Sequence, residues 1–240
     1  MVGKRNSWAG WASLRPMADA IKAVLWDIDG TLISTGGAGA VAWQRAFEEL
    51  YGVEANIDEH TRAGMTDPEI TEIIFNEVVG REGTPEEHAQ VVAKYLEQMP
   101  EAVAESPGYE VKPGIAEILP RLAEAGIAQG IVTGNVEPAA RIKLARGGLD
   151  KYFPFGGYGS DDRDRVKVTQ QAIERGGEIM GAPLDLAATI AVGDTPRDVS
   201  AGHGAGIRVV GVATGAYSVA EQDEAGADWA IADVTNGFPI

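Results

Sequence analysis

Two aspartates separated by one residue follow the first apolar run of the chain, in the order Asp27-Ile28-Asp29-Gly30-Thr31. Gly30 permits a sharp turn directly after them. Carboxylates this close repel each other unless a cation or a shared proton lies between them. One interpretation is a nucleophile (Asp27) and a general acid and base (Asp29) with Mg²⁺ between them. A solvent-exposed turn would carry the same short pattern, so these residues alone leave both interpretations open.

A further acid follows a later apolar run, in the segment Gly193-Asp194-Thr195-Pro196. Thr195 and Pro196 form a good helix start, and Asp198 could simply complete its capping box. Helix capping does not explain Asp194. Together with the two aspartates of the first run, Asp194 would form a site of hard oxygen ligands suited to Mg²⁺.

A third polar segment, Thr133-Gly134-Asn135, follows another apolar run and precedes a helical pattern. A hydroxyl and free backbone N–H groups at the start of a helix can hold a phosphate. Ordinary capping by threonine or asparagine is the alternative interpretation.

The elements that would position these residues alternate between strands and helices. Short apolar runs without alternation are typical of strands that are covered on both faces. Such runs alternating with helical patterns predict a parallel sheet built of βαβ units. The predicted strands are 21–26, 127–132, 155–158, 189–192, 208–212 and 229–231, and the predicted helices between them are 136–146, 164–175, 196–203 and 219–225.

Residues 36–110 show helical patterns only, over 38–51, 68–79 and from 85 towards Met99. Asp67 is the predicted N-cap of the second helix, and Thr84 with Glu87 fits a capping box at the start of the third. An insertion after the first strand would lie over the edge of the sheet where α/β proteins bind ligands. We therefore expect it to act as a lid.

The chain has 240 residues and a formal net charge of −16. That charge argues against binding to nucleic acid, which needs clustered lysine and arginine. No apolar stretch is long enough for a membrane span, and the absence of cysteine favours a cytoplasmic protein. We interpret residues 1–16 as a flexible N-terminal extension.

The three motifs together resemble the haloacid dehalogenase-like hydrolase superfamily, in order and spacing, over residues 17–235. The inserted helices, with Gly64-Met65-Thr66-Asp67, resemble its phosphoglycolate phosphatase and β-phosphoglucomutase branch. The resemblance implies a doubly wound parallel sheet, an α/β core of residues 17–35 and 111–240, and an all-helical cap of residues 36–110. It also implies a Mg²⁺-dependent phosphatase that hydrolyses a small organic phosphate monoester.

The resemblance also implies a role for each motif residue. Asp27 would attack phosphorus to form an aspartyl-phosphate, and Asp29 would protonate the leaving oxygen and then deprotonate the hydrolytic water. Thr133 and the N–H groups of Gly134 and Asn135 would hold the phosphoryl oxygens. The implied Mg²⁺ ligands are Asp27, the Asp29 main-chain carbonyl and Asp194, with Asp198 in a supporting role.

One departure from the family pattern concerns its lysine, often followed by proline, ahead of the helix after the third strand. The corresponding segment, Ser160 to Lys167, contains no Lys-Pro pair. Alignment of the apolar positions of the helix places Arg163 at the lysine position, where its guanidinium could neutralise Asp27 and contact phosphate. Lys167 is the second candidate.

Other functions remain possible from the sequence. A phosphomutase would share the metal and both aspartates, whereas a 2-haloacid dehalogenase would need neither Asp29 nor Asp194. An acidic, cation-binding interaction protein is the alternative outside the enzymes. Residues 58–67, with Arg62, Met65 and Thr66, are expected to select the substrate. The expected partner is a small phosphorylated molecule, and the expected assembly is a monomer or a homodimer.

Overall fold

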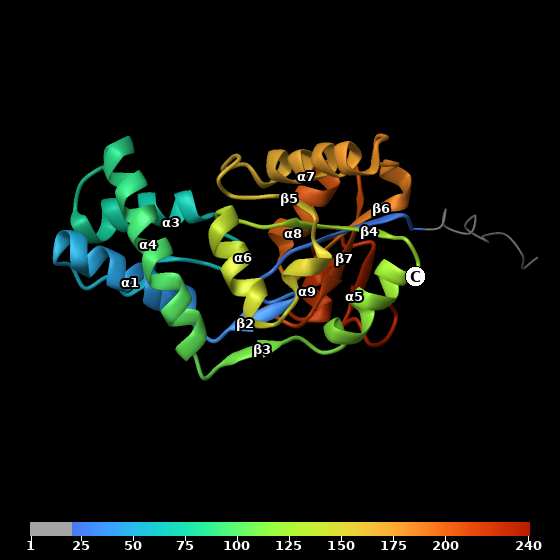
Figure 1. Ribbon diagram of the computed structural model, residues 1–240, viewed down its shortest axis with the longest axis horizontal. Helices are drawn as coiled ribbons and strands as arrows, with labels where there is room; N and C mark the ends of the chain where they lie inside the picture. The colour runs from blue at the N-terminus through green and yellow to red at the C-terminus, as the bar shows by residue number, and fades with distance from the viewer. Residues whose placement is uncertain (1–20) are drawn as a thin grey trace, which may run out of the picture.

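The computed structural model describes residues 21–240, so the interpretation of residues 1–16 lies outside the described residues. A six-stranded parallel sheet forms the centre of the larger lobe (Figure 1). All the predicted strands are present, and no helix within residues 21–240 is long and apolar enough to cross a membrane. The strand order is β5 (Phe155–Gly157), β4 (Ala128–Val132), β1 (Ala23–Trp26), β6 (Thr189–Gly193), β7 (Arg208–Val212) and β8 (Trp229–Ile231).

Both faces of this sheet are covered, because alternate residues of a strand point to opposite sides. Val24 and Trp26 of β1 pack with α5 (Ile115–Glu124) and α6 (Glu137–Arg146). Leu25 belongs to a separate apolar cluster with residues of the helices on the other face. Two buried cores flanking one parallel sheet confirm the predicted doubly wound α/β class. The helices of the second face are α7 (Arg165–Met180) and α8 (Pro196–Gly204), and α9 (Val219–Glu224) packs against β7 and β8.

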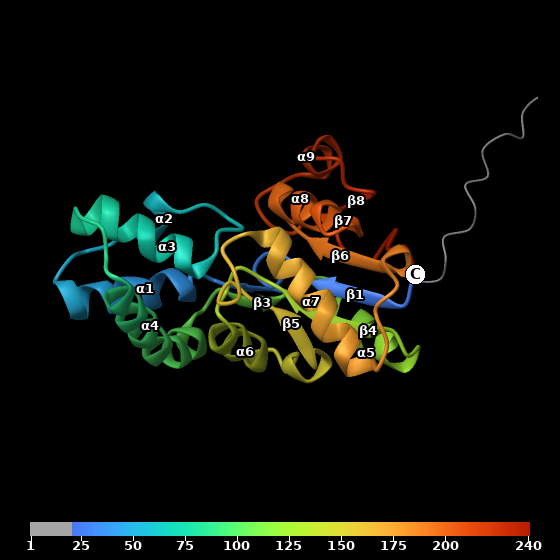
Figure 2. The ribbon, with the colours of Figure 1, turned by 90° about the horizontal axis from the view of Figure 1, so that it is seen from above.

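Apart from two 3-10 turns of the larger lobe, Asp150–Tyr152 and Leu186–Ala188, the remaining helices form a second lobe at the other end of the molecule (Figures 1 and 2). Its centre is an apolar cluster in which the rings of Trp43 and Tyr95 stack with their centroids 3.9 Å apart. These helices are α1 (Ala38–Tyr51), α2 (Ile57–His60), α3 (Asp67–Ile74), which continues into a π-helical turn over Phe75–Val79, and α4 (Pro85–Glu105).

Two short strands connect the lobes. β2 (Ile33–Thr35) pairs antiparallel with β3 (Tyr109–Val111), so the chain leaves the sheet and returns to it through one ribbon. Three-residue strands carry too little pattern to be identified in the sequence. The boundaries at residues 36 and 110 stay a prediction, although the ribbon lies at both of them.

Some helices differ from the sequence prediction. The N-cap of α3 is Thr66 rather than Asp67, because the Thr66 and Glu69 side chains form a reciprocal capping box. The capping box predicted at Thr84 and Glu87 is present. Helices α2 and α5 were not predicted, although Ile115, Ile118, Leu119 and Leu122 have the spacing of a helical apolar face.

Candidate active site

The acids of the two aspartate motifs lie at the carboxyl ends of β1 and β6, which are neighbours in the sheet. The sheet pairing continues one residue past β1, since the Asp27 N–H donates to Val192 O at 2.9 Å. Asp27, Asp194 and Asp198 are buried, and each offers a carboxylate oxygen within 4.8 Å of the others. Acids from two segments that are distant in sequence therefore meet at one edge of the sheet.

Burial changes the acidity of this group. Desolvation first, and the charge of Asp198 second, raise the pKa of Asp27 well above its ordinary value, although Arg165 opposes the shift. The same two causes raise the pKa of Asp194 to about 7. Ionised together, these acids need a cation among them, and closely placed carboxylate oxygens suit a hard divalent ion such as Mg²⁺.

Two glycines permit the close packing of Asp194. A Cβ atom at Gly30, where φ is 88°, would lie 2.4 Å from Asp194 Oδ2, and one at Gly215 would lie 1.7 Å from it. Thr31 Oγ1 donates to Asp194 Oδ1 at 3.4 Å. Gly30 therefore permits both the turn after Asp29 and the close approach of Asp194. Gly215 permits the same approach, but no pattern in the sequence indicates its role.

The guanidinium beside Asp27 belongs to Arg165, and the expectation that Arg163 faces Asp27 is wrong. Arg165 Nη2 lies 3.4 Å from Asp27 Oδ1 and also donates to Asp198 Oδ1. Arg163 pairs instead with Glu72, and its side chain is 53% exposed. Lys167, the second candidate, pairs with Asp162 at 3.0 Å.

The start of α7 explains this difference. Asp164 is the N-cap and accepts from the Val166 N–H, so Arg165 is the first helical residue and its side chain is buried. Arg163 lies in the loop before the helix. The sequence predicts that this helix begins at residue 164 and aligns it with the family by its apolar positions alone. That alignment assigns the family's basic position to Arg163, two residues before Arg165.

The predicted phosphate cradle is buried next to these acids. Asn135 Nδ2 donates to Thr133 Oγ1 at 2.8 Å and to Asp29 Oδ2 at 2.7 Å. The Asn135 N–H also points to Thr133 Oγ1, at 3.3 Å. A Cβ atom at Gly134 would lie 2.4 Å from Met65 O, so only glycine allows this approach of the second lobe. The structure thus connects this segment directly to Asp29.

A lysine that the sequence analysis did not consider completes this connection. Lys143, on α6, donates from Nζ to Asp29 Oδ2 at 2.7 Å and to Asn135 Oδ1 at 2.6 Å. Lys143 is buried together with Ala139, Ala140 and Leu144 of the same helix. A lysine on the apolar face of a predicted helix is the signal that could have identified it, because lysine is rarely fully buried without a partner.

The second lobe contacts the cradle through Asp67. The Asp67 N–H donates to Gly134 O, and Asp67 Oδ2 accepts from the Val136 N–H, each at 2.8 Å. Burial raises the pKa of Asp67 to about 6, although the charge of Lys143 and the Val136 N–H oppose the shift. Because Thr66 caps α3, the Asp67 carboxylate is available for this contact between the lobes.

A cavity of about 270 Å³ lies between the lobes, and both Asp29 and Lys143 line it. Of the residues expected to select the substrate, Arg62 and Met65 line this cavity, whereas Thr66 is occupied as the cap of α3. The cavity beside Asp29 is therefore formed by both lobes.

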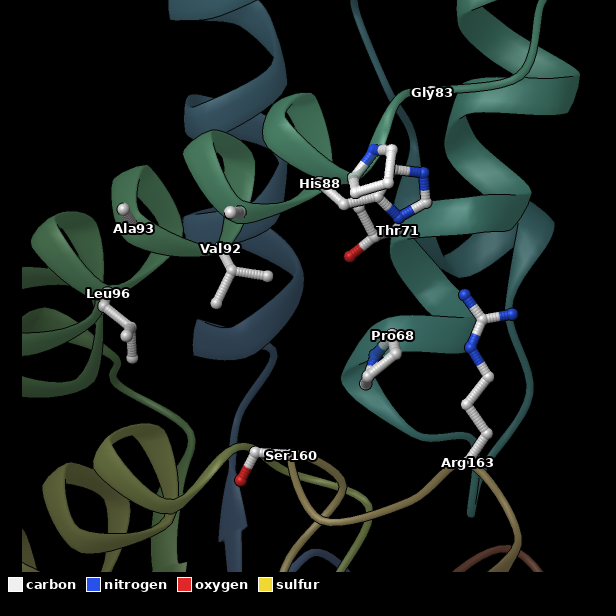
Figure 3. Close-up of a pocket in the computed structure, with 11 residues that line it drawn as sticks. Pro68, Thr71, Gly83, His88, Val92, Ala93, Leu96, Ser160 and Arg163 are labelled. Atoms are coloured by element: carbon white, nitrogen blue, oxygen red, sulfur yellow. The ribbon is translucent and has the colours of Figure 1, made fainter.

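A larger cavity of about 750 Å³ lies between α3, α4 and the loop that carries Arg163 (Figure 3). Its lining is mostly apolar, with Pro68, Val92 and Leu96, and unlike the smaller cavity it includes neither Asp29 nor Lys143. Its size alone does not make it the reaction site.

Comparison with known proteins places the chain in a family. A sequence model described as "Haloacid dehalogenase-like hydrolase" matches residues 24–212. Pyrophosphatase PpaX of Halalkalibacterium halodurans is 30% identical over 196 residues, which cover 80% of this chain and 85% of that protein. Phosphoglycolate phosphatase of Synechococcus elongatus is 26% identical over 196 residues, with 81% and 85% covered.

Solved structures share the fold. CbbY from Rhodobacter sphaeroides in complex with phosphate superposes with a TM-score of 0.70 at 21% identity, covering 88% of this chain and 93% of that one. A predicted phosphoglycolate phosphatase from Haemophilus somnus gives a TM-score of 0.70 at 19% identity, covering 89% and 94%. The family model over residues 24–212 and the relative at 30% identity show that the chain belongs to the haloacid dehalogenase-like hydrolase family, as its motifs predicted, and that the protein is an enzyme of the hydrolase class.

Proposed function

We propose that the protein is a Mg²⁺-dependent phosphatase that hydrolyses a small phosphate monoester through an aspartyl-phosphate on Asp27. The observation that carries the proposal is the cluster of Asp27, Asp194 and Asp198 beside Arg165. Relatives named for phosphoglycolate and pyrophosphate hydrolysis support a phosphorylated substrate. Both of those names describe small substrates with a second anionic group.

Asp27 is the proposed nucleophile. One of its carboxylate oxygens bonds to phosphorus as the bond from phosphorus to the leaving oxygen breaks. Asp29 donates its proton to that oxygen, and the product alcohol leaves. Asp29 then takes a proton from water, which attacks the phosphorus of the aspartyl-phosphate and releases inorganic phosphate and the Asp27 carboxylate.

Arg165 and the cradle bind the phosphoryl group. The Arg165 guanidinium lies between Asp27 and Asp198, so its position is fixed before substrate arrives. A positively charged donor fixed in a buried site stabilises the charge that develops on phosphoryl oxygens. Thr133, Gly134 and Asn135 supply the remaining polar groups from the end of β4.

The cation site is proposed to comprise the Asp27 and Asp194 carboxylates and the Asp29 main-chain carbonyl. Asp198 has a supporting role, because its Oδ1 accepts from Arg165 and its Oδ2 from Thr195. A Mg²⁺ ion bound there would neutralise phosphoryl charge and allow the anionic Asp27 and the anionic substrate to approach each other.

The cavity restricts the substrate. Its volume of about 270 Å³ corresponds to about nine water molecules at roughly 30 Å³ each. That space suits a leaving group of a few carbon atoms rather than a nucleotide or an oligosaccharide. Arg62 and Lys143 are the cations that line it among the described residues.

The proposal is tested by a screen of small phosphorylated compounds, including the esters p-nitrophenyl phosphate and 2-phosphoglycolate and the anhydride pyrophosphate, with and without Mg²⁺. Wild type should release phosphate from at least one ester only with Mg²⁺, and Asp27→Asn should release none. Asp185→Asn, a change at an aspartate near the opposite end of β6, should behave as wild type.

Two outcomes would overturn the proposal. Release of phosphate by Asp27→Asn at the wild-type rate would show that Asp27 is not the nucleophile. A requirement for an added bisphosphate, with isomerised product instead of free phosphate, would identify a phosphomutase.

A further inference from the structure

The Lys143 ammonium is buried where an apolar side chain would be expected. It lies on the inner face of α6, and its side chain is 6% exposed, against 41% for its partner Asp29. Burial of an ammonium group is costly unless charged or polar partners satisfy it. Lys143 has such partners in Asp29 and Asn135, so its ammonium group donates hydrogen bonds to these two residues in place of solvent.

The hydrogen bonds to the Asp29 side chain all converge on one oxygen. Lys143 Nζ and Asn135 Nδ2 both donate to Asp29 Oδ2 at 2.7 Å. An oxygen that accepts two hydrogen bonds, one of them from a cation, is the one that stays unprotonated. When Asp29 carries a proton, that proton is therefore held on Oδ1.

We infer that Lys143 is a positioning residue that fixes the orientation of the Asp29 carboxyl by occupying Oδ2 and so directs its proton to Oδ1. The inference rests on the proposed function, in which Asp29 protonates the leaving oxygen. A general acid must present its proton within hydrogen-bonding distance of that oxygen. Without Lys143, the Asp29 carboxyl would rotate more freely. The Asn135 amide would then be the one remaining side-chain donor that holds Oδ2 in place.

Asn135 couples this arrangement to the phosphate cradle. Its amide donates to Thr133 Oγ1 and Asp29 Oδ2 and accepts from Lys143 on the other side. Lys143 thereby also fixes which way the Asn135 amide faces, since its ammonium can only donate. Acid and cradle are held in one relative position by a single cation.

The test compares leaving groups. Lys143→Met should lower kcat/KM at least about 100-fold for an alkyl phosphate, whose leaving oxygen needs a proton. For p-nitrophenyl phosphate, whose leaving group departs without one, the loss should stay within about tenfold. A merely structural role would lower both values equally, and equal losses would overturn the inference.

A double-mutant comparison supplies a second readout. If Lys143 acts through Asp29, then adding Lys143→Met to Asp29→Asn should cost almost nothing further on the alkyl phosphate. Additive losses would show that Lys143 acts elsewhere and would overturn the inference. Lys143→Gln, which keeps one donor, should give an intermediate loss and serves if the methionine variant does not fold.

The control is Lys94→Met. Lys94, on α4, donates to Glu97 at 2.6 Å and pairs with Glu49 at 2.8 Å, and it does not line the cavity. This variant should keep the wild-type ratio between the two substrates. Failure of the proposed function is distinguishable, because it would appear in wild type as the absence of Mg²⁺-dependent hydrolysis of either ester.

Discussion

The two sides of the cavity between the lobes are built differently. The side formed by the larger lobe carries Asp29, Asn135 and Lys143, which hydrogen-bond to one another, and the same lobe holds the buried Asp27, Asp194 and Arg165. The side formed by α1 to α4 is held by apolar and aromatic packing, with Trp43 stacked on Tyr95 at its centre. Its polar contact with the cradle is made by Asp67.

This difference separates two tasks. Charges fixed at the sheet edge are costly to bury and have few tolerated replacements, so substitutions there should affect the reaction itself. Apolar packing tolerates exchange of side chains of similar volume, so the helical side can change what the cavity accepts without loss of fold. Sheet-side variants should thus lower kcat, and helix-side variants should change KM.

The strongest test of the sheet side is removal of the cation. Chelation of divalent ions should lower activity to background, because the buried acids then repel each other and the anionic substrate. Mg²⁺ should restore activity and Ca²⁺ should not, since Ca²⁺ prefers a larger number of ligands at longer distances. Equal initial rates with the two ions would show that the acids do not form a tight Mg²⁺ site.

Arg165 gives the next largest effect. Arg165→Met should lower kcat by about 100- to 1,000-fold, the usual loss for one fixed donor to developing charge. Arg163→Met is the matched control, since Arg163 pairs with Glu72 at the surface, and its kcat should remain near that of wild type. The kcat values of the two variants are compared by steady-state kinetics on one ester. A larger loss of kcat in Arg163→Met than in Arg165→Met would show that Arg163 is the site residue.

Arg62 tests the helix side. Arg62→Ala should raise KM about tenfold for an ester with a second anionic group, with kcat nearly unchanged, because the lost contact lies away from phosphorus. An ester with an uncharged leaving group should show little change in KM. A fall in kcat equal to that of the Arg165 variant would contradict the division of tasks.

Asp67 connects the two sides and gives the smallest effect. Its pKa is raised to about 6 from an ordinary value of 3.8, so the folded state binds its proton more tightly than the unfolded state does. Its contribution to stability is therefore greatest below pH 4 and is lost as the pH rises through 6. The ionised form, facing Lys143, Asp29 and Tyr95, costs stability at higher pH.

Asp67→Asn keeps a carbonyl acceptor for the Val136 N–H but does not ionise. Compared with wild type, the variant should gain roughly 1–3 kcal/mol between pH 5 and pH 8. In thermal unfolding of the metal-free protein that gain corresponds to ~2–4 °C for each kcal/mol. A difference in Tm that is the same at both pH values would show that Asp67 does not titrate in this range.

The sequence predicted the sheet, its strand ends and the acids on them, because each acid directly follows an apolar run. Arg165 was missed because the charged segment before α7 has no apolar periodicity that would fix where the helix begins. Lys143 and Asp29 are 114 positions apart, and their contact depends on how α6 packs on the sheet. The same holds for Asp67 and Val136, 69 positions apart, whose contact joins the two lobes. Such contacts follow from tertiary packing and leave no local pattern.

The most direct test of the proposed chemistry is to trap the phosphoenzyme. Wild type quenched with acid during turnover in Mg²⁺ should carry one phosphoryl group on the peptide that contains Asp27, and mass spectrometry should locate it on that aspartate. Asp194→Asn should show almost none. A phosphoryl group on another residue, or undiminished hydrolysis with no labelled Asp27, would contradict the account.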